Sequence, residues 1–121
     1  GLGGVKGSRK HVEETARILT EMDPEFAGAL TLTLIPGTAL YEEYRRGDFE
    51  LITPFDSLGE LKGLVENSTF TNCFFSSMHA SNYFAIRGTM PRDKDRVLRE
   101  LNTLLSRKDP RLLRPEFMRG L

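Results

Sequence analysis

The chain has little sulfur, little histidine and no long apolar run, and each absence narrows its possible roles. Its 121 residues include one cysteine, Cys73, two histidines and no tryptophan. A single cysteine excludes an internal disulfide and is typical of a reducing compartment, so we expect a cytoplasmic protein. No stretch approaches the roughly 20 apolar residues that a membrane-spanning helix needs. Cys73, His11 and His79 also lack the spacing of a metal site.

The charge is balanced overall but unevenly distributed. Net charge is zero, with an acidic excess in the first half and a basic excess from Arg87 onward. Basic and acidic residues alternate over residues 92–96, which is typical of a solvated helix face. No basic motif is interleaved with aromatic residues, so nucleic-acid binding is not expected.

Apolar periodicity predicts three longer helices and one short one. Ser8 is a candidate N-cap for a helix that ends at Asp23-Pro24, because the residue before proline avoids helical geometry. Thr38 is a candidate cap for a short helix that ends at Gly47. The other two helices are expected from Asp56 or Ser57 to Asn67 and from Pro91 to about Lys108, followed by a basic tail that packs on the domain.

Two strands are predicted between these helices. Leucine alternates with threonine over Gly28–Ile35, which predicts a half-buried strand with Leu30, Leu32 and Leu34 on one face. Phe70–Ser77 is the second strand, and residues 84–89 are expected to be loop or a short extended piece. The alternation of helices and strands predicts an α/β fold with parallel strands and crossover helices. Two strands leave open edges, which need further strands or a second copy.

Polar residues follow the second predicted strand directly. His79, Ser81, Asn82 and Tyr83 lie where the loops of α/β proteins bind ligands. The same residue types also form ordinary turns, so the pattern leaves both readings open. A hydrolase that uses Ser81 and His79 would need a carboxylate, and none lies nearby in the sequence.

Two glycine-containing turns are the remaining candidates. Gly1, Leu2, Gly3 and Gly4 precede a helix, so their amides could receive an anion or a nucleotide, or the glycines could serve a positive φ. Their spacing is not that of the dinucleotide fingerprint. Pro36-Gly37 is foremost a type II turn signal and secondarily a ligand loop.

Taken together, several segments resemble the C-terminal half of radical S-adenosylmethionine proteins, of the oxygen-independent coproporphyrinogen oxidase and methylthiotransferase type. The matching segments are Gly1-Leu2-Gly3-Gly4, Ser8 through Met22, residues 36–41, residues 79–83 and residues 90–94. The resemblance implies a partial parallel (β/α) barrel. It also implies a [4Fe–4S] cluster, which is held by the three cysteines of a C-x-x-x-C-x-x-C motif and binds S-adenosylmethionine.

The resemblance also implies roles for particular residues. Gly1, Leu2, Gly3, Gly4, Pro36 and Gly37 would lie on the adenosine side, and His79, Ser81, Asn82 and Tyr83 on the substrate side. Residues 1–90 would be the C-terminal portion of the barrel, and residues 91–121 a helix and basic tail packed on it.

The cluster cysteines are absent, because Cys73 stands alone. We therefore expect a piece of a longer enzyme, inactive alone, whose partner is the missing N-terminal half of the barrel. The alternative is a non-catalytic binding module that associates, for example with itself, through an open strand edge.

Overall fold

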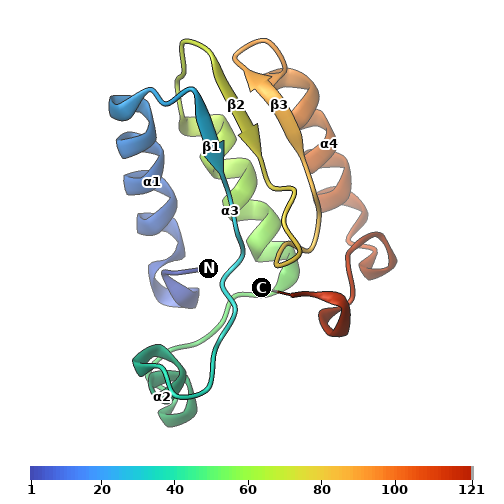
Figure 1. The fold of residues 1–121 in the computed structure, drawn as a ribbon. Coiled ribbons are helices and arrows are strands. Elements are labelled where there is room, and N and C mark those ends of the chain that lie inside the picture. The colour runs from blue at the N-terminus through green and yellow to red at the C-terminus, as the bar shows by residue number, and fades with distance from the viewer. Residues whose placement is uncertain (121) are drawn as a thin grey trace.

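Three short strands form one mixed sheet in the computed structural model, which describes residues 1–120 (Figure 1). The strands are β1 (Phe26–Gly28), β2 (Cys73–Ser76) and β3 (Arg87–Met90), in the order β1-β2-β3. β1 and β2 are parallel, with Ala27 opposite Phe75, whereas β2 and β3 are antiparallel. The chain is therefore an α/β protein with a small mixed sheet.

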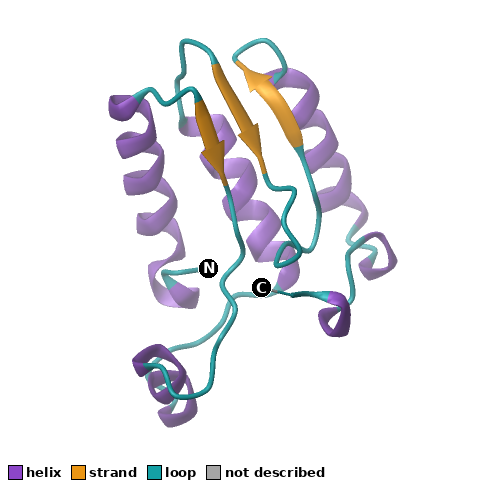
Figure 2. Cartoon of the chain, viewed as in Figure 1, coloured by secondary structure: helices purple, strands orange, loops and turns teal. Residues whose placement is uncertain are grey.

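Three helices pack side by side against this sheet (Figure 2). They are α1 (Gly4–Met22), α3 (Pro54–Asn67) and α4 (Lys94–Arg107). The shorter α2 (Ala39–Arg46) has no buried residue and projects away from the body of the molecule. Two single turns, η1 (Pro110–Leu112) and η2 (Glu116–Met118), form the C-terminal tail. Within residues 1–120, no helix is long and apolar enough to cross a membrane.

The core lies between the sheet and the helices because alternate strand residues point toward the helices. Phe75 and Met90 from the sheet are each 1% exposed, and Val97 and Leu101 of α4 are fully buried. In the part of the chain that the structure describes, the opposite face of the sheet carries no helix (Figure 1). Phe26 and Phe74 stack there with ring centroids 5.9 Å apart, and they are 64% and 40% exposed.

Most helix boundaries follow from local signals. Thr53 caps α3 through a reciprocal capping box with Asp56, with Pro54 in the first turn. Thr38 caps α2, and Gly47 ends it at a φ of 82°. These starts and stops confirm the two predicted helices, although α3 begins slightly earlier than expected.

The predicted N-cap of the first helix is wrong. Ser8 lies inside α1, whose N-cap is Gly3, five residues earlier, because the helix already begins at Gly4. The last helix also begins at Lys94 rather than at Pro91. Its tail packs on the domain as predicted, since Leu113 is only 7% exposed.

The predicted strand Gly28–Ile35 is largely a loop. β2 ends at Ser76, so the last bond to β1 is the Ala29 amide donating to the Ser76 carbonyl. Beyond it the chain has no neighbouring strand to pair with, and Leu30 is 62% exposed instead of buried. Alternating leucine and threonine predicted an extended segment, but a ladder also needs a partner.

The two predicted strands pair in parallel, as expected. The sheet also has a third strand that was not predicted as one: residues 87–90 lie at the end of the segment expected to be loop or a short extended piece, and they form the antiparallel β3. Gly88 allows α4 to lie close to this strand. A Cβ atom at Gly88 would be 2.8 Å from the Asp93 Cβ.

Candidate functional site

The candidate site lies at the edge of the sheet where β1 and β2 end. Because both strands run in the same direction, the segments that follow them, residues 29–35 and residues 77–86, emerge together (Figure 1). The N-termini of α1 and α3 lie at this edge as well. The structure therefore brings together residues 1–4, called the glycine turn below, and residues 79–83, called the polar loop. The sequence places these two segments far apart.

Asn82 joins the two post-strand segments. Its side-chain amide donates to the carbonyls of Ala29 and Ser77, at 2.8 and 2.7 Å. Its Oδ1 atom accepts from the Thr31 hydroxyl at 2.8 Å. The residue is 6% exposed, so these protein partners occupy its hydrogen-bonding groups. Asn82 thus holds the loops together.

His79 and Ser81 form a local pair within the polar loop. The Ser81 backbone amide donates to His79 Nδ1 at 3.2 Å, and the Ser81 hydroxyl lies 2.9 Å from the same nitrogen. Nδ1 is therefore an acceptor, which puts the proton of the neutral ring on Nε2. His79 is half-buried and Ser81 is buried. The serine hydroxyl serves to orient the ring, which leaves Nε2–H as the group that this loop offers.

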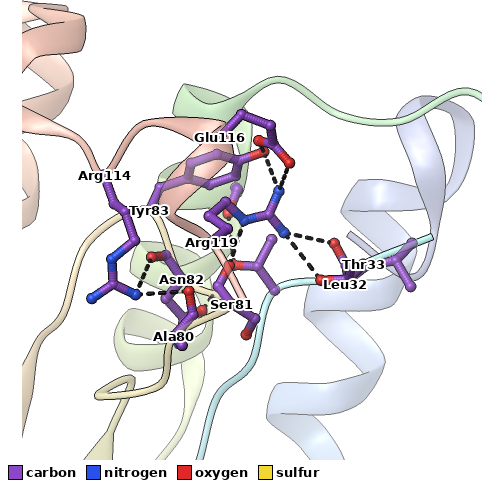
Figure 3. A network of polar contacts seen from close by, with 11 residues as sticks. Leu32, Thr33, Ala80, Ser81, Asn82, Tyr83, Arg114, Glu116 and Arg119 are labelled. Carbon is purple, nitrogen blue, oxygen red and sulfur yellow. Dashed lines mark hydrogen bonds and ion pairs between the residues drawn. The ribbon is translucent and has the colours of Figure 1, made fainter. Parts of the chain in front are cut away.

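The guanidinium of Arg119 lies against the face of the Tyr83 ring (Figure 3). The Arg119 Cζ atom is 4.2 Å from the centre of the Tyr83 ring. The phenol donates to Glu116 at 2.8 Å and accepts from Arg119 at 2.7 Å. Burial, followed by the hydrogen bond to Glu116, raises the pKa of Tyr83 to about 12. The phenol thus stays protonated at neutral pH.

The glycine turn is shaped by steric need. Gly4 has a φ of 57°, and a Cβ there would lie 2.8 Å from the Glu50 carbonyl oxygen. The Gly4 amide donates to the Gly1 carbonyl, and the Val5 amide donates to the Glu50 carbonyl at 2.9 Å. Two amides of the first turn are thus already occupied. Leu2 is 65% exposed beside them.

A buried carboxylate that the sequence analysis missed supports this turn. Glu60 of α3 is 7% exposed and accepts from the Ser8 hydroxyl at 2.6 Å and from the Gly1 amine. No local pattern marks Glu60, since it is one of several acidic residues on an amphipathic helix. Ser8 therefore has a tethering role instead of the capping role predicted for it.

Pro36 and Gly37 lie apart from the other candidates. Gly37 has a φ of 86°, and the Thr38 amide donates to the Ile35 carbonyl at 3.2 Å, which makes residues 35–38 a type II turn. Both residues are exposed at the start of α2. The turn reading is confirmed, and the structure does not bring these two residues to the polar loop.

A cavity of about 250 Å³ opens beside Tyr83. Its walls combine the glycine turn, the segment after β1, the return from α2 and the tail. They include Gly1, Thr31, Leu34, Ile52, Tyr83 and Arg119. The polar loop, through Tyr83, and α3, through Ser57, complete the walls at the sheet edge.

The described residues offer no evident metal centre. Within residues 1–120, no three histidine, cysteine or acidic side chains are grouped to hold an ion. Cys73 is buried in β2, and this burial raises the pKa of its thiol. A buried, protonated thiol is a poor ligand and a poor nucleophile.

Comparisons with models of protein families, with curated proteins and with solved structures find no match to this chain.

Proposed function

We propose that this chain supplies part of the active site of a cytoplasmic radical S-adenosylmethionine enzyme, as the C-terminal portion of a partial (β/α) barrel. The observation that carries the proposal is the meeting of the glycine turn and the polar loop at one sheet edge. Gly1 lies against the segment after β1, since a Cβ at Gly1 would be 3.3 Å from the Leu32 Cβ. Ligands of open α/β sheets bind at such an edge.

The glycine turn would form the adenosine side. Gly1 has no side chain where it faces the segment after β1, which would let a flat ring approach the backbone there. Pro36 and Gly37 stay in this proposal only as a rim, because their turn is exposed at the start of α2.

The polar loop would form the substrate side. His79 presents Nε2–H, a hydrogen-bond donor whose tautomer is set by the Ser81 contacts to Nδ1. A donor fixed in this way can orient a carbonyl or carboxylate of a substrate. Ser81, Asn82 and Tyr83 would contribute by holding that donor in place.

The residues of this chain do not fit an iron–sulfur cluster. The chain has a single cysteine, which is buried in a strand, and a [4Fe–4S] cluster needs several thiolate ligands. The proposal therefore assigns the cluster to another segment, with this chain as its partner. Iron and sulfide added to this chain alone should give no stoichiometric cluster, and a cluster formed there would contradict the proposal.

The experiment uses the complete encoded protein, reconstituted without oxygen and then reduced. S-adenosylmethionine should be cleaved to 5′-deoxyadenosine, detected by mass spectrometry. His79→Ala should leave the affinity for S-adenosylmethionine unchanged while lowering substrate turnover. Arg107→Gln, at the exposed end of α4, is the control and should behave like the wild type. A complete protein that neither binds nor cleaves S-adenosylmethionine would refute the proposal.

A second candidate function is a binding module that pairs with a second copy of itself. The observation in its favour is the helix-free sheet face, where Phe26 and Phe74 are exposed beside the open edge of β1. Sedimentation analysis should then show a dimer that Phe26→Ser dissociates. A monomer at every concentration would exclude this candidate.

A further inference from the structure

The C-terminal tail forms hydrogen bonds to the main-chain carbonyl groups of the polar loop. Five consecutive carbonyl groups, those of residues 79–83, each accept a hydrogen bond from residues 114–120. Arg114 Nη1 donates to the carbonyls of residues 79, 80 and 82, at 3.1, 2.7 and 3.3 Å. The Arg114 and Gly120 amides donate to the carbonyls of Tyr83 and Ala80. A loop bonded at every carbonyl has little freedom to move.

Arg119 connects this loop to the segment after β1 (Figure 3). Its Nε atom donates to the Ser81 carbonyl at 2.7 Å, and its Nη2 atom donates to the Leu32 carbonyl at 2.9 Å. The remaining contacts are with Thr33, Tyr83 and Glu116. A guanidinium has five N–H donors, and these contacts use them all.

Because every N–H donor of Arg119 is already used, its role as a substrate-binding residue can be distinguished from a role as a bridge between two loops. The Arg119 side chain is only 7% exposed, yet it has no donor left for a ligand. An arginine that bound substrate at this edge would leave part of its fork free. The geometry instead suits a bridge that holds two loops at a set distance.

We propose that residues 113–120 form a clamp, and that Arg119 and Arg114 are positioning residues that hold His79 and the cavity beside Tyr83 in one arrangement. The importance of the clamp for a reaction rests on the proposed function. The clamp itself is testable in this chain without any cofactor, so its failure and that of the proposed function can be told apart.

The test compares Arg119→Met and Arg114→Met with the control Arg111→Met, whose side chain in the same tail hydrogen-bonds, among residues 1–120, only to Asp109. Amide hydrogen exchange should accelerate by roughly tenfold or more at the hydrogen-bonded amides of residues 79, 81 and 82 in the first two variants, with core amides of β2 and β3 unchanged. The control should match the wild type. Equal acceleration throughout the core, or none in the loop, would overturn the clamp.

The ring of His79 supplies a second, spectroscopic readout. In the wild type, ring nitrogen shifts should report one tautomer, with Nδ1 unprotonated, because Ser81 donates to it. Arg119→Met should give a mixture of both tautomers. If this variant does not fold, Arg119→Lys retains the charge on a single nitrogen that cannot span both loops, and it should show the same mixture. A single tautomer in Arg119→Lys would count against the proposal.

Discussion

Replacing Asn82 by alanine should destabilise the chain more than any exposed substitution, because one side chain satisfies three partners. The Ser77 carbonyl keeps the His79 amide as a donor, so losing its bond from Asn82 costs about 0.5–1.5 kcal/mol. Ala29 and Thr31 are half-buried and can bond to water instead, so each loses about 0.5–1 kcal/mol. The sum is about 2.5 kcal/mol, against a total stability of about 5–15 kcal/mol for a small domain.

Urea unfolding at neutral pH measures this loss, with Asn102→Ala on the exposed surface of α4 as the matched control. The control should change stability by no more than about 0.5 kcal/mol. Asn82→Asp should be worse than Asn82→Ala, because a carboxylate oxygen would replace the nitrogen that faces two carbonyl oxygens. If Asn82→Ala cost no more than the control, or if Asn82→Asp matched the wild type, the tethering role would be refuted.

Three further outcomes follow from the same structure. Gly4→Ala should lower the free energy of unfolding by about 1–3 kcal/mol, because Gly4 has a positive φ and a Cβ there would lie 2.8 Å from a carbonyl oxygen. Gly7→Ala should instead stabilise α1 by up to about 1 kcal/mol, because the space around its Cβ is open. Thermal unfolding compares the two variants, and a Gly4→Ala variant more stable than Gly7→Ala would contradict this prediction. Burial raises the pKa of Tyr83 to about 12. The stability that this shift contributes should therefore be fully present below the ordinary tyrosine pKa of about 10 and be lost as the pH rises toward 12. In an alkaline titration, one phenolate absorbance step should appear at higher pH than the others and be absent in Tyr83→Phe. The hydrogen bond from Arg92 is the main cause that lowers the pKa of Asp93 to about 2. The stability that this shift contributes should be present above pH about 4 and be lost as the pH falls toward 2. Asp93→Asn should therefore lower the urea midpoint at pH about 7 and leave it unchanged at pH about 2.

The features that the sequence predicted well are those with local causes. Thr38 is a capping residue beside an amphipathic stretch, and it caps α2 in the structure as predicted. The turn after Ile35 follows from the dipeptide Pro36-Gly37 alone. The polar loop was found because its residues are contiguous and directly follow an apolar strand.

The features that were missed depend on partners distant in the sequence. The leucine–threonine alternation predicted a long strand, but pairing stops where β2 ends at Ser76. Arg119 contacts Leu32, which is 87 residues away, and Glu60 contacts Ser8, which is 52 residues away. No local pattern in a basic tail or a charged helix identifies which residue will be buried. The residues that hold the site together, such as Arg119 and Glu60, could therefore not be predicted from the sequence, although the loops that they hold could be.

The most direct measurement of the central claim is to sequence the encoded polypeptide immediately ahead of Gly1. Our account predicts a strand that leads into the glycine turn and, farther upstream, three cysteines spaced as C-x-x-x-C-x-x-C. An encoded protein that supplies no such cysteines would contradict it.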